Sequence, residues 1–82
     1  MAITKEYIRE AFIRCKENPE HTHMLIVCDT FDWDDYPVEI SKGRDIHEAV
    51  RYYSQNMQKV MEVYNMDLPM EPQLAQYRAF NY

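Results

Sequence analysis

The most regular pattern in the chain is a run of apolar residues that recurs every three or four positions between residues 46 and 65. A spacing of about 3.6 residues over five turns is typical of one buried face of an α-helix. Asp45 precedes the run and Glu48 lies three residues later, as in a capping box. The pattern predicts a helix over 46–65, which could bend where Asn56 offers a second cap. Its predicted core positions are Ile46, Ala49, Val50, Tyr53, Met57, Val60, Met61 and Tyr64.

A shorter apolar period predicts a first helix over residues 5–17. Thr4 can cap its N-terminus, and Asn18 is disfavoured in the helical region because Pro19 follows it. The apolar positions of this helix are Tyr7, Ile8, Ala11, Phe12 and Cys15.

Two short segments between these helices have the composition of β-strands. Residues 24–28, "MLIVC", form a continuous apolar run too short for a helix, and residues 37–41, "PVEIS", alternate apolar and polar positions. They predict an antiparallel hairpin whose turn is the acidic stretch between them, since aspartates bond their own backbone in turns. Beyond the second helix, Pro72 is placed to begin a short helical turn, and the tail 78–82 is apolar enough to dock.

Together these elements predict a single α+β domain over residues 1–82, in which the hairpin packs on two main helices in the order αββα with a short C-terminal helical turn. A hairpin covered on one side only is marginally stable. We therefore expect a homodimer that extends the sheet or pairs the second helix.

Composition excludes several classes of protein. The net charge of −5 argues against nonspecific binding of nucleic acid or of anionic membranes, because both require a basic surface. No apolar run approaches the roughly 20 residues that span a bilayer, and the charged N-terminus is unlike a secretory signal, so we expect a cytoplasmic protein. A single glycine, Gly43, excludes a glycine-rich phosphate loop. Cys15 and Cys28 are expected to be reduced and buried.

Three segments, "THMLIVCDTFDWDDYPV", "NMQKVMEVYNMDL" and "LAQYRAFNY", resemble an uncharacterised family of small proteins found in bacteria and their phages. The resemblance covers most of the chain from Thr22 onward. It implies a cytoplasmic protein of bacterial or phage origin and assigns no activity, cofactor or site residue.

The metal-binding patterns in the sequence are incomplete. An EF-hand loop begun at Asp32 fails because Tyr36 and Pro37 occupy its fifth and sixth positions. Asp29 and Asp32 could converge on Mg²⁺ or Mn²⁺, and a metal-dependent hydrolase using them is the least favoured function.

Zinc could use His21 and His23 together with Cys28 or Cys15, but their spacing matches no closed zinc motif. Cys28 is a weak candidate nucleophile, because an acidic neighbour raises the pKa of a thiol. No metal ligand, catalytic residue or cofactor is predicted.

The leading interpretation is a noncatalytic binding protein that contacts another protein through its hairpin tip. Trp33 would either fold back on its own domain or belong to an interface. The contact residues of this prediction are Phe31, Asp32, Trp33, Asp34, Asp35 and Tyr36.

The alternative is a small-ligand binder, such as a phage-encoded sponge for a nucleotide signal, with its pocket at a dimer interface. Tyr52 or Trp33 would stack on a base there, and Arg44 or Arg51 would contact phosphate.

Overall fold

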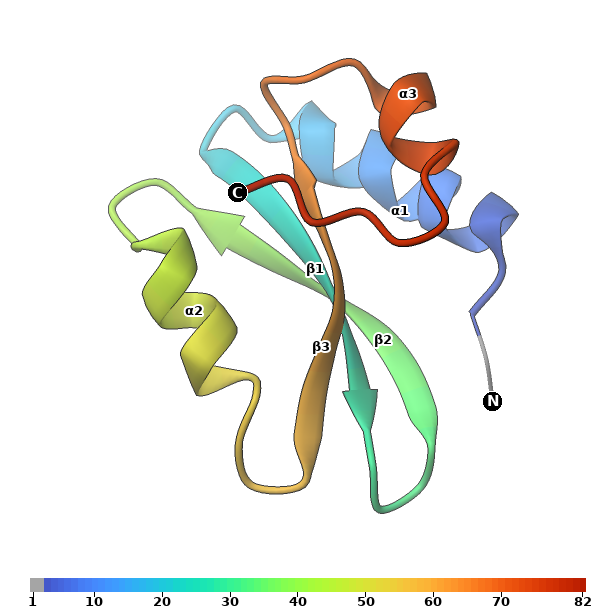
Figure 1. Cartoon of the computed structure of the whole chain (residues 1–82). Coiled ribbons are helices and arrows are strands. Elements are labelled where there is room, and N and C mark those ends of the chain that lie inside the picture. The colour runs from blue at the N-terminus through green and yellow to red at the C-terminus, as the bar shows by residue number, and fades with distance from the viewer. Residues whose placement is uncertain (1–2) are drawn as a thin grey trace.

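A computed structural model describes residues 3–82 of the chain, which form one mixed α+β domain of three helices and one three-stranded sheet (Figure 1). Its elements in chain order are α1 Lys5–Glu17, β1 His21–Asp29, β2 Asp34–Ser41, α2 Ile46–Tyr52, β3 Gln58–Asn65 and α3 Met70–Leu74.

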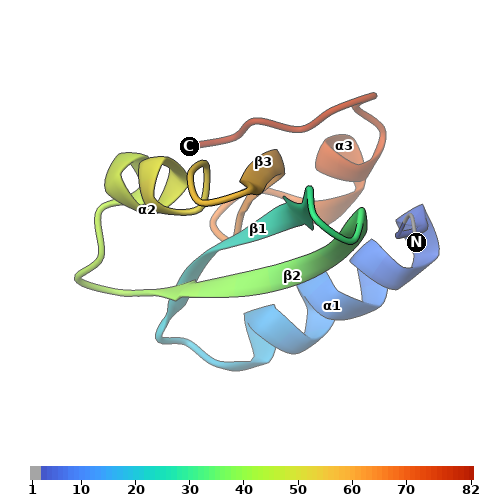
Figure 2. The ribbon, with the colours of Figure 1, turned by 90° about the horizontal axis from the view of Figure 1, so that it is seen from below.

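The sheet is antiparallel with the strand order β2-β1-β3, so β1 is the central strand. Helices cover both faces of this sheet, with α1 and α2 on opposite sides (Figure 2). One core contains Met24 and Ile26 from β1 with α1 and α3, and the other contains Leu25 and Val27 with α2. Burial on both faces explains why β1 is a continuous apolar run rather than an alternating one.

The first helix and both N-terminal caps confirm the prediction from sequence. Helix α1 spans the predicted residues, and the Thr4 hydroxyl accepts a hydrogen bond from the Tyr7 N–H at 3.1 Å. At the start of α2, the Asp45 carboxylate accepts from the backbone N–H groups of His47 and Glu48 at 2.8 and 3.1 Å. These bonds satisfy helix N–H groups that have no partner within the helix.

The predicted helix over 46–65 is wrong beyond its first two turns. Helix α2 ends at Tyr52, and residues 58–65 form the strand β3, which pairs with β1 along its whole length. Asn56 and Met57 have positive φ angles of 57° and 66°, so the connection between α2 and β3 cannot continue as a right-handed helix. The buried central strand β1 needs backbone partners on both edges, and this requirement overrides the helical pattern.

A β-bulge in β3 accounts for the misleading pattern. The register with β1 shifts between Ile26 and Val27, which stand opposite Glu62 and Val60, so Met61 is an extra residue. Val60 and Val63 therefore face the same core although they lie three positions apart. Three-residue spacing on one face imitates a helix in the sequence.

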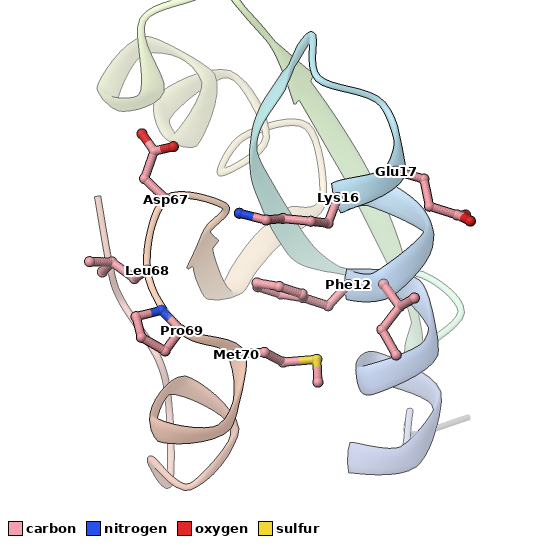
Figure 3. A pocket seen from close by; sticks show the side chains of 8 residues that line it. Phe12, Lys16, Glu17, Asp67, Leu68, Pro69 and Met70 are labelled. Atoms are coloured by element: carbon pink, nitrogen blue, oxygen red, sulfur yellow. The ribbon is translucent and has the colours of Figure 1, made fainter.

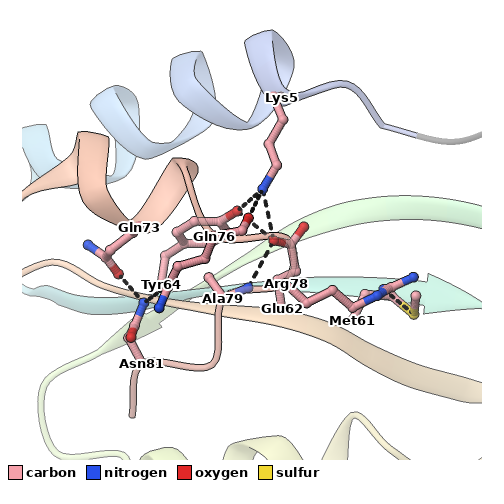
Figure 4. Close-up of polar contacts among 9 residues, drawn as sticks. All are labelled: Lys5, Met61, Glu62, Tyr64, Gln73, Gln76, Arg78, Ala79 and Asn81. Carbon is pink, nitrogen blue, oxygen red and sulfur yellow. Dashed lines mark hydrogen bonds and ion pairs between the residues drawn. The ribbon is translucent and has the colours of Figure 1, made fainter.

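The bulge also places a buried carboxylate, Glu62, beneath α1 (Figure 4). Its Oε1 accepts hydrogen bonds from the Tyr64 hydroxyl at 2.7 Å and from the Ala79 N–H at 3.3 Å, and Lys5 Nζ lies 3.3 Å away. A buried charge needs partners of this kind to offset its desolvation. Burial and the Glu62 carboxylate raise the pKa of Tyr64.

The C-terminal segment is anchored by Gln73, which is 3% exposed. Its side-chain amide donates to the carbonyl oxygens of Asn65, Leu68 and Pro69 and accepts from the Asn65 N–H at 2.8 Å. The predicted helical turn is α3, which begins before Pro72, and the tail docks as expected: Val63 donates to the Ala79 carbonyl at 2.7 Å and accepts from the Asn81 N–H at 3.0 Å. The tail thus covers the outer edge of β3.

The sequence predicted a homodimer that extends the sheet or pairs the second helix, and the structure weakens the argument for both arrangements. The sheet is covered on both faces, and the long second helix that was to pair with its copy is a strand over residues 58–65. The outer edge of β2 remains for sheet extension, but Pro37 within it has no N–H to donate to a neighbouring strand.

Candidate functional site

The hairpin turn is a four-residue connection, 30–33, closed by hydrogen bonds to Asp29. The Asp29 carbonyl accepts from the Trp33 N–H at 2.6 Å, and its side-chain Oδ1 accepts from the Phe31 N–H at 2.9 Å. The hairpin and the local role of an aspartate in its turn are as predicted from sequence. The turn is shorter than expected, since Asp34 already belongs to β2.

A second loop reaches the same end of the sheet. Both the backbone N–H and the hydroxyl of Thr30 donate to the Met57 carbonyl, each at 2.8 Å. Trp33 has a φ of 59°, and Asn56 and Met57 also lie in the left-handed region. Such conformations are costly for side chains other than glycine and asparagine, so the bonds to Thr30 and Asp29 have to hold this backbone in place.

Three large apolar side chains project from the two loops. The exposed fractions of Phe31, Trp33 and Met57 are 73%, 69% and 59%. We call these three residues, with the exposed carboxylates of Asp32 and Asp34, the tip surface. Met57 was predicted to be a core residue of a helix, and that prediction is wrong.

The remaining residues predicted for the hairpin tip lie further into the sheet. Asp35 is partly buried and forms a hydrogen bond with the Cys28 thiol, whose pKa is raised mainly by burial and also by this carboxylate. Tyr36 packs against the core beneath α2, and its hydroxyl accepts a hydrogen bond from the Gln58 side-chain amide. Burial raises the pKa of Tyr36.

The residues predicted for nucleotide binding lie at α2. The Arg44 guanidinium carbon is 5.4 Å from the ring centroids of both Tyr52 and Tyr53, and Arg51 is in the last turn of α2. Trp33 precedes β2 whereas Arg44 follows it, and eight strand residues separate them by roughly 26 Å. Trp33 and Arg44 therefore cannot contact the same mononucleotide.

The cysteines are free and buried, as predicted. Burial and the Glu39 carboxylate raise the pKa of Cys15 to about 11, so its thiol is protonated at neutral pH and is a poor nucleophile. Within residues 3–82, Cys15, His21 and Glu39 form a group of potential metal ligands. One ligand atom from each of them lies within 4.8 Å of the other two. Glu39 was not predicted as a ligand, and neither Asp29 nor His23 is part of this group.

A pocket that the sequence did not indicate lies between α1 and the segment 67–70 (Figure 3). Its volume is about 570 Å³. Lys16, whose Nζ donates to the Met66 carbonyl, stands at its edge. Its lining combines apolar side chains with a charged rim and consists of Phe12, Ile13, Lys16, Glu17, Asp67, Leu68, Pro69 and Met70. This lining could hold an apolar side chain or small molecule, but it brings together no nucleophile and base.

No protein-family model, curated protein or solved structure matches the chain. The resemblance to small bacterial and phage proteins therefore stays a prediction. Within residues 3–82, no helix is both long enough and apolar enough to cross a membrane.

Proposed function

We propose that this chain is a noncatalytic binding protein that contacts another protein through its tip surface. The supporting observation is that two separate loops, joined by the bonds of Thr30, expose Phe31, Trp33 and Met57 at the same end of the sheet. Clustered aromatic and methionine side chains are typical of interface centres, where they become covered by a partner. We place the protein in the cytoplasm as part of this proposal, because free buried cysteines fit a reducing compartment.

The backbone of the tip surface supports the same proposal. Left-handed conformations at Trp33 and Met57 cost stability that a glycine would not cost. Burial within the domain does not offset the cost of placing large apolar side chains at these strained and exposed positions. Coverage by a partner would offset it.

Photo-cross-linking tests the proposal directly. A benzophenone amino acid placed at Phe31 or at Met57 should give the same cross-linked partner in host lysate, whereas one placed at Tyr82 should not. Tyr82 is the matched control because it is also an exposed aromatic residue but lies at the opposite end of the sheet (Figure 1). A product of twice the chain mass would identify a second copy as the partner. Cross-linking from Tyr82 alone would contradict the proposal.

A nucleotide is the second candidate ligand, and the stacking of Arg44 against Tyr52 favours it at α2. A nucleotide retained by the purified protein and lost in Tyr52→Ala would support this alternative. In that case Trp33→Ala should retain the nucleotide, since Trp33 lies at the other end of β2.

The carboxylates of the tip surface should control the rate of association. Asp32 and Asp34 are exposed, so the double change Asp32→Asn/Asp34→Asn removes charge and retains hydrogen-bonding ability. With a basic partner, we expect the association rate at low ionic strength to fall roughly three- to tenfold and its salt dependence to weaken. Stopped-flow measurements at two salt concentrations will show this.

The matched control for this experiment is Glu6→Gln/Glu10→Gln, which removes two exposed charges from α1. Equal slowing by both double variants would mean that net charge, rather than the tip surface, steers the partner.

A further inference from the structure

A second cluster of chemically active side chains lies where the C-terminus of α1 meets the start of β1. Cys15 comes from the last turn of α1, His21 is the first residue of β1, and Glu39 comes from β2. One potential ligand atom from each residue lies within 4.8 Å of the other two. His21 and Asp29 mark opposite ends of β1, roughly 26 Å apart, so this cluster is separate from the tip surface.

Backbone hydrogen bonds fix the connection that carries two of these residues. Asn18 donates to the Cys15 carbonyl at 3.3 Å, and His21 donates to the Asn18 carbonyl at 3.0 Å. The adjoining Glu20 carbonyl accepts from the Lys42 N–H at 2.7 Å, which ties the connection to the end of β2. Side chains on a backbone held in this way lose little further freedom when they bind a common ligand.

The imidazole of His21 is oriented between the other two residues. Its Nδ1 is 3.0 Å from the Cys15 carbonyl oxygen and 3.8 Å from Glu39 Oε2. The Cys15 side chain is fully buried, and its Sγ lies 3.8 Å from the His23 carbonyl oxygen. A thiol, an imidazole and a carboxylate from three elements thus converge at the edge of the core.

We propose that Cys15, His21 and Glu39 form a binding site for a divalent transition metal of the zinc class. A thiolate and an imidazole select Zn²⁺ over Mg²⁺ or Ca²⁺, which prefer oxygen ligands only. Tetrahedral zinc, with bonds of about 2.0–2.3 Å, places its ligand atoms about 3.3–3.7 Å apart. The cluster must therefore contract by about 1 Å, and the Glu39 side chain can move because it is 47% exposed.

The surroundings supply the rest of the site. On binding, the metal replaces the proton of the Cys15 thiol, which leaves to solvent. The C-terminus of α1 carries partial negative charge that favours a cation.

Cobalt substitution tests the site in the reduced protein. One equivalent of Co²⁺ should produce the intense visible bands of a four-coordinate ion and a near-ultraviolet sulfur-to-cobalt charge-transfer band, and Zn²⁺ should displace it. Cys15→Ser should abolish the charge-transfer band, whereas Cys28→Ser should retain it. Cys28 is the matched control because it is also buried and free but lies at the other end of β1.

Two further variants keep the test decisive should Cys15→Ser fold poorly. Glu39→Gln changes an exposed side chain and should weaken Zn²⁺ binding by about tenfold or more without altering the circular dichroism spectrum. His23→Gln should bind Zn²⁺ as the wild type does, because His23 is outside the cluster. Zn²⁺ should also raise the melting temperature of the wild type more than that of Glu39→Gln.

The simpler interpretation of the cluster is a surface contact between His21 and Glu39 above a buried cysteine. That interpretation is correct, and the proposal overturned, if Co²⁺ gives only the weak spectrum of a six-coordinate ion. A charge-transfer band that persists in Cys15→Ser, or equal Zn²⁺ affinity of the wild type and Glu39→Gln, would overturn it as well.

Discussion

Trp33→Ala is expected to weaken binding of the protein partner by about 2 kcal/mol or more, roughly 30-fold in Kd, because truncation of a central aromatic residue removes an interface hot spot. The free energy of unfolding should change by no more than about 1 kcal/mol, since the side chain is 69% exposed in the folded domain. Calorimetric titration with the partner that cross-linking identifies measures the binding free energy, and urea unfolding of each variant measures its stability.

Trp33→Gly separates binding from stability more sharply. Because Trp33 has a φ of 59°, glycine relieves strain there, and we expect the unfolding free energy to stay the same or rise while binding is lost. Tyr82→Ala is the control, an exposed aromatic residue at the far end of the sheet that should bind normally. A loss of about 3 kcal/mol of stability in Trp33→Ala would instead place the indole in the core and refute the tip surface.

The features that sequence predicts correctly are those determined by near neighbours. The Thr4 and Asp45 caps depend on side chains three residues or fewer from the N–H groups that they satisfy. The hairpin also depends on local turn chemistry, because Asp29 bonds the backbone of the residues that follow it. These interactions are the same in many tertiary contexts, so a single sequence is sufficient to predict them.

The strand β3 could not be predicted because its identity depends on a distant partner. Val60, Val63 and Tyr64 fit a helix and a bulged strand equally well, since the extra residue Met61 changes the side-chain alternation. The deciding interaction is the pairing with β1, at least 29 residues earlier in the chain. Tertiary contacts of this kind override local propensity.

The candidate sites divide in the same way. Acidic and aromatic residues of the hairpin turn are adjacent in the sequence and could be identified from it. Met57 joins them only through its bond with Thr30, so its role required the correct assignment of β3. The cluster of Cys15, His21 and Glu39 was equally hidden, because Glu39 reaches α1 only after the hairpin folds against that helix.

Tyr64→Ala is expected to have the largest effect on stability, a loss of about 3–5 kcal/mol. The Tyr64 side chain is fully buried, lies edge-on to Phe12 with ring centroids 6.2 Å apart, and donates its hydroxyl proton to Glu62. Small domains have about 5–15 kcal/mol of net stability, so much of the variant should be unfolded in mild denaturant. Urea unfolding followed by circular dichroism will measure the loss.

Tyr64→Phe keeps the ring and removes only the hydroxyl. The free energy of unfolding at neutral pH should fall by about 1–3 kcal/mol, because the buried Glu62 carboxylate loses a hydrogen-bond donor. Its pH dependence tests whether the hydroxyl is buried beside the Glu62 carboxylate. The raised pKa of Tyr64 means that the folded state retains a proton that the unfolded chain releases near pH 10. The wild type should therefore lose stability as the pH rises above about 10, and Tyr64→Phe should lose less. Equal alkaline losses in both proteins would show that the Tyr64 hydroxyl is neither buried nor bonded to Glu62 as the structure has it, because burial is the larger cause of its raised pKa.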